Sequence, residues 1–178
     1  MKRQLLVLLL LAVTPAIPHA QSFISKEEAL RLCFPEPMTI ERRTAFLTDE
    51  EARAIEDRAH SKVPSRLLTY YVGRDSATIR GYAFIETDIV RTMPQTLLIH
   101  IAPDARVRSV ELLAFHEPAD YRAPQPWLDL FRNRRLDEEL WLKRGLHNIA
   151  GATITGQTTI SLVRRMLATC EIVVAGKN

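Results

Sequence analysis

Residues 67–114 read LLTYYVGRDSATIRGYAFIETDIVRTMPQTLLIHIAPDARVRSVELLA. Short runs rich in β-branched and aromatic residues alternate here with polar positions, and turn residues at 73–75 and 102–104 separate the runs. A period of two is typical of strands that bury one face. We therefore predict a meander of about four antiparallel strands. Their apolar positions are Leu68, Tyr70 and Val72, then Ile79, Tyr82, Phe84 and Ile85, then Leu97, Ile99 and Ile101, then Val107, Val110, Leu112 and Ala114.

Helical signals flank the predicted meander on both sides. Residues 25–28 (SKEE) and 48–51 (TDEE) each have the form of a capping box, in which a hydroxyl and a glutamate satisfy the first N–H groups of a helix. Residues 126–142 show a mixed helical pattern, and apolar residues recur at helical spacing across 160–170. Helices before and after a run of strands predict one α+β domain, with helices packed on an antiparallel sheet of about four or more strands.

The first 20 residues have the layout of a secretory signal peptide. Lys2 and Arg3 precede an apolar run over residues 5–13, and a small residue lies before the predicted cleavage point. The run is shorter than the roughly 20 residues that a membrane-spanning helix needs. We predict cleavage after Ala20, with cleavage after Ala16 or retention as a membrane anchor as alternatives. The predicted organisation is a signal peptide at 1–20, an N-terminal helical segment at 21–64 and the main domain at 65–178.

The charge of the chain gives no reason to expect binding to nucleic acid. Its 178 residues include 24 Lys and Arg against 21 Asp and Glu, a net charge of +3. Removal of Lys2 and Arg3 with the signal peptide leaves 22 basic residues against 21 acidic ones. A basic group near the third helical segment is interleaved with acids, which favours a solvated face of mixed charge. The basic residues of that group are Arg132, Arg134, Arg135, Lys143 and Arg144.

Two cysteines, Cys33 and Cys170, remain after removal of the predicted signal peptide. An oxidising compartment permits a disulfide between them, which would join the two ends of the domain. Their neighbours are apolar, so two buried free thiols are an equal alternative. Neither cysteine has a close histidine or cysteine partner, and the five histidines are scattered, so we predict no metal site.

Residues 147–158 read HNIAGATITGQT and hold the strongest candidate for a cofactor site. Gly151 gives the backbone freedom, Ala152 is too small to obstruct an approach, and Thr153 offers a hydroxyl. The helix that follows exposes free N–H groups in its first turn, which stabilise a phosphate.

Residues 148–155, placed after a β-rich stretch in a chain with an export signal, resemble the FMN-binding domain of two membrane complexes. These are the C subunit of the sodium-pumping NADH:quinone oxidoreductase and the G subunit of the Rnf complex. Residues 95–114 followed by His116-Glu117 are similar to the paired strands and the histidine–glutamate stretch of that family. The resemblance covers roughly residues 65–170. It implies that 65–178 is an FMN-binding domain.

In that family an exported FMN transferase takes FMN from FAD and esterifies its phosphate to the last threonine of a Ser/Thr-Gly-Ala-Thr motif. Thr153 is the matching residue, and Thr155 is expected to cap the helix while backbone donors hold the phosphate. The chain departs from the family at His147, where aspartate is usual, and at Ala150, where serine or threonine is usual. The residues that the resemblance places near FMN are Thr153, Ala152, Gly151, Ala150, Thr155, His147, Glu117 and His116.

The resemblance implies an exported flavoprotein, periplasmic or on the outer face of the cytoplasmic membrane, that relays electrons and is not a stand-alone enzyme. Its expected partners are an FMN transferase and a membrane redox complex or cytochrome. One alternative is a non-redox or non-covalent FMN-binding scaffold that has lost attachment, which the changes at 147 and 150 permit. Another is the flavin-bearing part of a reductase assembled from several chains.

Overall fold

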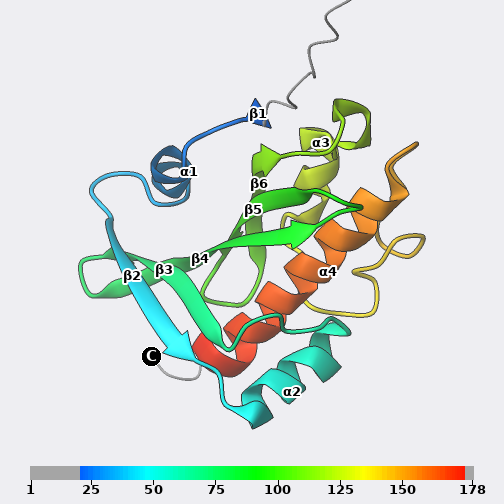
Figure 1. Cartoon of the computed structure of the whole chain (residues 1–178). Coiled ribbons are helices and arrows are strands. Elements are labelled where there is room, and N and C mark those ends of the chain that lie inside the picture. The colour runs from blue at the N-terminus through cyan, green and yellow to red at the C-terminus, as the bar shows by residue number, and fades with distance from the viewer. Residues whose placement is uncertain (1–20, 175–178) are drawn as a thin grey trace, which may run out of the picture.

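The strands form one antiparallel sheet on which the helices pack (Figure 1). The computed structural model describes residues 21–174, so the predicted signal peptide at 1–20 lies outside the described residues. Within the described part, no helix combines the length and the apolar character needed to cross a membrane. The strands are β1 (Gln21–Ser22), β2 (Thr39–Phe46), β3 (Leu67–Asp75), β4 (Thr78–Ile89), β5 (Pro94–Ile101) and β6 (Val107–Phe115). The α-helices are α1 (Lys26–Cys33), α2 (Asp49–Ala59), α3 (Gln125–Leu128) and α4 (Thr153–Thr169). Two short 3-10 helices, η1 (Ala119–Tyr121) and η2 (Asp129–Phe131), and a π-helix, η3 (Cys170–Val174), complete the set in residues 21–174.

The strand order across residues 21–174 is β1-β6-β5-β4-β3-β2. From β2 to β6 each strand pairs with the next one in sequence, as expected of a meander. β1 joins the other edge, where Gln21 pairs with Phe115 and Ser22 with Ala114. The predicted meander is confirmed, and the protein is a single α+β domain.

Different helices bury the two faces of the sheet. α4 lies diagonally across one face, with α2 alongside it (Figure 1). Phe84 and Ile99 point from the sheet into this larger core, to which Val163 of α4 also belongs. Leu98, next to Ile99 on β5, points the opposite way and packs with Phe34 in the smaller core under α1. Successive residues of the central strands thus alternate between two hydrophobic cores, and not between one core and solvent.

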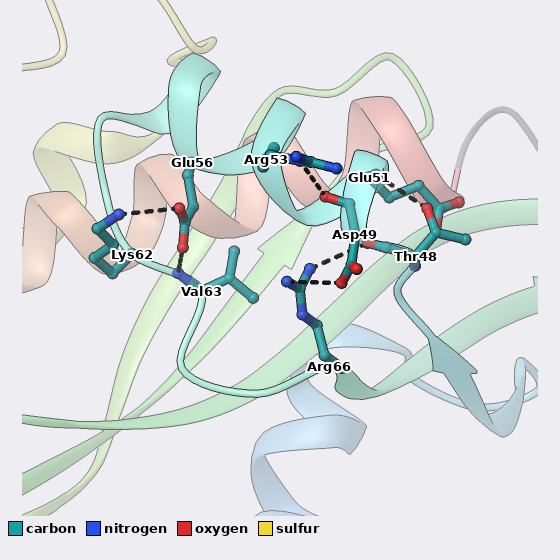
Figure 2. A network of polar contacts seen from close by, with 8 residues as sticks. All are labelled: Thr48, Asp49, Glu51, Arg53, Glu56, Lys62, Val63 and Arg66. Atoms are coloured by element: carbon teal, nitrogen blue, oxygen red, sulfur yellow. Dashed lines mark hydrogen bonds and ion pairs between the residues drawn. The ribbon is translucent and has the colours of Figure 1, made fainter.

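Polar contacts join both ends of α2 to the chain segments that flank it (Figure 2). The hydroxyl of Thr48 accepts from the N–H of Glu51 at 3.1 Å, and the Glu51 carboxylate accepts from the N–H of Thr48 at 2.9 Å, which completes the predicted capping box. Arg66, just before β3, donates to the Thr48 carbonyl at 3.1 Å. At the other end the Glu56 carboxylate accepts from the N–H of Val63 at 2.9 Å. The loop after α2 is therefore tied to the helix.

The segment at 21–64, predicted as helical, also contains two strands of the sheet. α1 and α2 are present, but β2 occupies 39–46 and β1 occupies 21–22. β2 reads TIERRTAF, and its three consecutive charged residues hide the period of two. An edge strand has a neighbour on one side only and tolerates such charges.

The helix predicted over 126–142 ends early. α3 stops at Leu128 and η2 stops at Phe131, and most of the following residues are irregular. Asn133 adopts a left-handed conformation with φ of 64°, which an α-helix does not accommodate. Its N–H donates to the Val107 carbonyl at 2.8 Å, and the N–H of Val107 donates to the Arg134 carbonyl at 3.0 Å. Pairing with the start of β6 therefore replaces the helix.

Cys33 and Cys170 are both free and buried. Cys33 belongs to the small core under α1, and Cys170 belongs to the core on the α4 face. The sheet lies between them, so the structure favours two free thiols over the disulfide. Burial raises the pKa of each thiol to about 12, so neither is a reactive thiolate at neutral pH.

His100 on β5 is the buried histidine of the small core, with 7% of its surface exposed. Its ring meets the Phe34 ring edge-on, with centroids 4.9 Å apart, and its Nε2 has no partner within the described residues. Burial, and secondarily the charge of Arg108, lowers the pKa of His100 to about 4. The unfolded chain, with a histidine pKa of about 6.5, therefore binds this proton more readily than the folded protein.

Acidification is expected to destabilise the protein through His100. The stabilisation is complete above pH ~6.5 and is lost progressively as the pH falls towards ~4, by about 2 kcal/mol at pH ~5. Urea unfolding at pH 7.5 and at pH 5 should show this loss in the wild-type protein but a much smaller one in His100→Asn. An equal loss in both proteins would show that other groups carry the pH dependence.

Candidate functional site

Thr153 is the first residue of α4, and its side chain is exposed. The preceding Gly151 has φ of 76°, a left-handed conformation that glycine adopts without steric cost, and a Cβ added there would meet no atom within 4 Å. The N–H of Ala152 donates to the Ile149 carbonyl at 3.1 Å, and its carbonyl accepts from Gly156 at 3.1 Å. This tight turn directs the chain into the helix and leaves the Thr153 hydroxyl accessible.

The N-terminus of α4 is available to bind an anion. The N-cap residue is Ala152, and no side chain in the described part of the chain caps this end. The first N–H groups of an α-helix have no acceptor within the helix. α4 has 17 residues, and its dipole acts together with these N–H groups to stabilise a negative group at the N-terminus of the helix.

Thr153 lies in a pocket of about 240 Å³ that the turn shares with two residues from distant segments. Arg91 comes from the turn between β4 and β5, and Tyr121 from η1. The Arg91 guanidinium lies over the Tyr121 ring, 4.5 Å from its centroid. The pocket therefore combines a hydroxyl, a helix N-terminus and a fixed positive charge, which is the chemistry that a phosphate ester requires. The remaining lining residues are Gly151, Ala152, Ile154 and Thr155.

Asn148 contacts the hydroxyl directly. Its side-chain amide donates to Oγ1 of Thr153 at 3.1 Å. The hydroxyl oxygen accepts this bond, so its own hydrogen stays free to be donated or lost. Asn148 belongs to the sequence motif but was not predicted as a site residue. Its position five residues before Thr153 is the sequence feature that could have identified it. Arg91 and Tyr121 gave no such signal, because only the fold brings them to the turn.

The prediction that Thr155 caps α4 is wrong. Thr155 lies inside the first turn, and only 1% of its surface is exposed. Its hydroxyl donates to the Tyr121 carbonyl at 2.5 Å. Thr155 thus holds η1 against the helix and keeps Tyr121 at the edge of the pocket, while the capping position belongs to Ala152.

Glu117 does not line the pocket, but it binds the turn that contributes Arg91 to the pocket. One oxygen of its carboxylate accepts from the N–H of Thr92 at 2.7 Å, from the Thr92 hydroxyl at 3.1 Å and from the N–H of Met93 at 2.9 Å. These bonds, with the Thr92 N–H first, lower the pKa of Glu117. The carboxylate therefore fixes the turn that carries Arg91. The neighbouring His116 donates its backbone N–H to the Pro94 carbonyl at 3.1 Å.

His147 and Ala150 are both exposed and neither lines the pocket. The backbone carbonyl of His147 accepts from the indole N–H of Trp127 at 2.8 Å, which anchors the start of the loop to α3. At these two positions the chain departs from the flavin family, and the structure places both departures outside the immediate surroundings of the hydroxyl.

Replacement of Glu117 by alanine is expected to weaken the site through Arg91. Without the carboxylate, the turn at 91–93 loses three acceptor contacts, so the positive charge is no longer held beside Thr153. On the expectation from the sequence that an FMN transferase modifies Thr153, the rate of that modification should fall several-fold, and Arg91→Ala should have a similar effect.

The matched controls for Glu117→Ala are Glu117→Gln and Glu50→Ala. Glutamine keeps an oxygen acceptor and should restore part of the rate, while Glu50 is an exposed glutamate on α2 far along the chain from the turn. If Glu50→Ala slowed modification as much as Glu117→Ala, the effect would be one of overall charge and not of the turn.

The titratable side chains in the pocket lining are those of Arg91 and Tyr121. None of its lining residues is a carboxylate, a histidine or a thiol. Nor do residues 21–174 contain a group of three or more histidine, cysteine, aspartate or glutamate side chains that would hold a metal ion.

Comparison of the sequence with protein-family models and with curated proteins finds no match in either.

Proposed function

We propose that this protein is an exported electron-transfer flavoprotein that carries one FMN as a phosphoester of Thr153. The observation that carries the proposal is the placement of one hydroxyl. Thr153 is exposed at the start of α4, at a helix end without a side-chain cap, in a pocket that also holds Arg91. A hydroxyl at this position serves as an attachment point, and the same surroundings stabilise the phosphate once it is attached.

The residues present fit the phosphate of FMN. Backbone N–H groups in the first turn of α4 and the guanidinium of Arg91 supply donors for its oxygens. The two non-bridging oxygens of a phosphodiester share one negative charge, which a single arginine and a helix dipole offset. The pocket lining includes no carboxylate that would oppose this charge.

The attachment step balances with FAD as the co-substrate. The bond between Oγ1 of Thr153 and the FMN phosphorus forms while the phosphorus–oxygen bond to the AMP half of FAD breaks. AMP leaves, and the hydroxyl proton is lost to the transferase or to solvent. The Asn148 amide, which donates to Oγ1, orients the oxygen and leaves that proton available for transfer. The protein itself undergoes no change of oxidation state in this step.

The resemblance to the FMN-binding domains supports a relay in place of a stand-alone enzyme. Bound FMN supplies one-electron and two-electron redox chemistry, and the protein contributes binding, orientation and electrostatics. The lining residues include no carboxylate, histidine or thiol, and the hydroxyl of Thr153 is the group assigned to attachment. The expected electron partners are a membrane redox complex or a cytochrome. A covalent bond suits an exported carrier, because lost flavin is not readily replaced outside the cell.

Coexpression with an exported FMN transferase tests the proposal. After denaturing electrophoresis, the band of the wild-type chain is expected to fluoresce as flavin, because a phosphoester survives the detergent. A chain expressed without the transferase is the control and should show no fluorescence. A dark band beside a fluorescent known substrate of the same transferase would contradict covalent attachment.

Equilibrium dialysis with free FMN then separates the two alternatives of non-covalent binding and scaffold. The departures at His147 and Ala150 are the specific reason to keep them, since both residues are exposed on the approach to Thr153. Saturable uptake of FMN by an unmodified chain would favour a non-covalent flavoprotein. If the chain neither binds free FMN nor is modified by the transferase, the scaffold without a cofactor is favoured.

A further inference from the structure

A second cavity, of about 620 Å³, lies on the face of the sheet that α1 covers only in part. His100 of β5 and Ser109 of β6, which are cross-strand partners, contribute to its lining, and Leu32 of α1 stands at its edge. α4 and the Thr153 pocket belong to the opposite face. The cavity is therefore separate from the proposed flavin site, and a ligand in it would bind whether or not Thr153 carries flavin.

Three arginines line this cavity, and one of them is fixed by its own contacts. The Arg106 guanidinium donates to the Asn133 carbonyl at 2.8 Å and lies 3.4 Å from the Asp104 carboxylate. Asp104 also lies 3.9 Å from Arg135, outside the cavity lining. Arg106 and Asp104 thus neutralise each other and form one wall.

The other two guanidinium groups, those of Arg108 and Arg132, have no such partner. Within residues 21–174 neither side chain makes a hydrogen bond or an ion pair, although both line the same cavity. Arg132 comes from the segment after η2, and Arg108 comes from β6. Two unpaired guanidinium groups facing one cavity from separate segments are the arrangement that recognises a carboxylate or a phosphate.

A β-bulge contributes Arg108 to the cavity. The register between β5 and β6 passes from His100–Ser109 to Ile101–Val107, so Arg108 is the extra residue. Val107 points into the large core, and the bulge lets Arg108 join Ser109 on the cavity side. Bulges redirect side chains in this way and are often found beside binding sites.

The remaining titratable groups leave the lining of the cavity with a net positive charge. Burial holds the pKa of His100 at about 4, so this residue is neutral at physiological pH. Glu111 is the one carboxylate of the lining apart from the paired Asp104, and burial raises its pKa, while the charge of Arg132 acts in the opposite direction. Two unpaired cations therefore face one partly buried carboxylate.

We propose that this cavity binds a small organic anion, a carboxylate or a phosphate ester, through the guanidinium groups of Arg108 and Arg132. The volume admits a molecule of several carbon atoms. The hydroxyl of Ser109 lies in the lining beside the arginines and provides a neutral polar contact.

Isothermal titration of the purified protein at low ionic strength and pH 7.5 tests this site, with citrate and glycerol phosphate as separate probes. Saturable binding of at least one probe, with one molecule per chain, is expected. Arg108→Ala and Arg132→Ala should each weaken binding by about tenfold or more, and Arg132→Lys, which keeps the charge but loses the planar fork, should fall between. The preferred probe tells whether the natural ligand carries a carboxylate or a phosphate.

The control is Arg42→Ala, which removes an exposed arginine from edge strand β2 and should leave the affinity unchanged. Unchanged urea midpoints would show that all four variants are folded. The proposal is overturned if neither probe binds, if both cavity variants bind as the wild type does, or if Arg42→Ala weakens binding equally. Binding should also be the same with and without flavin on Thr153, so the two proposals fail separately.

Discussion

Thr153→Ala is expected to abolish covalent flavin completely while leaving the fold intact. The substitution removes the hydroxyl that forms the phosphoester, and no other lining residue of the pocket has a hydroxyl positioned to replace it. Thr155 is buried and donates to the Tyr121 carbonyl, and Tyr121 is a phenol, which the family reaction does not use. Intact-protein mass spectrometry after coexpression with the transferase should find only the unmodified mass.

Two further substitutions make this result specific. Thr153→Ser keeps a hydroxyl at the same place and should retain flavin, although serine lacks the methyl group that restricts the side chain. Thr158→Ala removes a hydroxyl one turn further along α4, outside the pocket, and should be modified like the wild type. If Thr153→Ala still acquired the mass of FMN, attachment would lie elsewhere and the proposed site would be wrong.

Arg164→Ala is expected to cause the largest loss of stability, about 4 kcal/mol. Arg164 is in the middle of α4, and only 1% of its surface is exposed. It donates to the Ala59 carbonyl at 3.0 Å and to the Asp137 carbonyl at 2.6 Å, and its guanidinium lies 4.3 Å from the centroid of the Trp141 ring. Alanine would remove the side-chain donor of the Ala59 carbonyl, at about 1–3 kcal/mol, and the shorter of two bonds to the Asp137 carbonyl, which also accepts from the N–H of Leu140 at 3.3 Å, and it would open a cavity.

The matched control is Arg53→Ala on the exposed face of α2. Within residues 21–174, the Arg53 side chain donates only to the Asp49 carbonyl of its own helix, at 3.1 Å, so its removal should change stability by less than about 0.5 kcal/mol. The free energy of unfolding from urea titration measures both variants. Similar values for Arg53→Ala and Arg164→Ala would mean that the buried arginine does not join α4 to the end of α2 and the loop at 137.

The fold could be predicted wherever one local pattern dominated. The period of two predicted the meander, and the capping box at Thr48 predicted the start of α2, because both signals depend on neighbouring residues only. β2 was missed because Glu41, Arg42 and Arg43 fall consecutively on an edge strand. The helix expected over 126–142 failed because pairing of Asn133 with Val107 is a long-range contact that local periodicity does not report.

The candidate site was predictable only in its continuous part. The turn at Gly151 and the exposed hydroxyl of Thr153 follow from residues adjacent in sequence, and the structure shows both. The cap was misassigned to Thr155, because a threonine near a helix start resembles a capping residue whether its hydroxyl faces the helix end or another segment. Arg91 reaches the pocket from another turn, so the sequence around Thr153 could not predict its presence there.

The cysteines show the same limit. Their apolar neighbours were compatible with pairing and with burial alike, since both states place the sulfur among hydrophobic side chains. Only the assignment of Cys33 to the α1 face and of Cys170 to the α4 face separates the two possibilities.

The most direct test of the central claim is peptide mapping of the wild-type chain after coexpression with an active FMN transferase. Proteolysis followed by tandem mass spectrometry assigns any modification to a residue. We predict that the peptide containing Thr153 carries FMN as a phosphoester on that residue. An unmodified Thr153 peptide, from a culture in which a known substrate of the same transferase is fully flavinylated, would contradict the account.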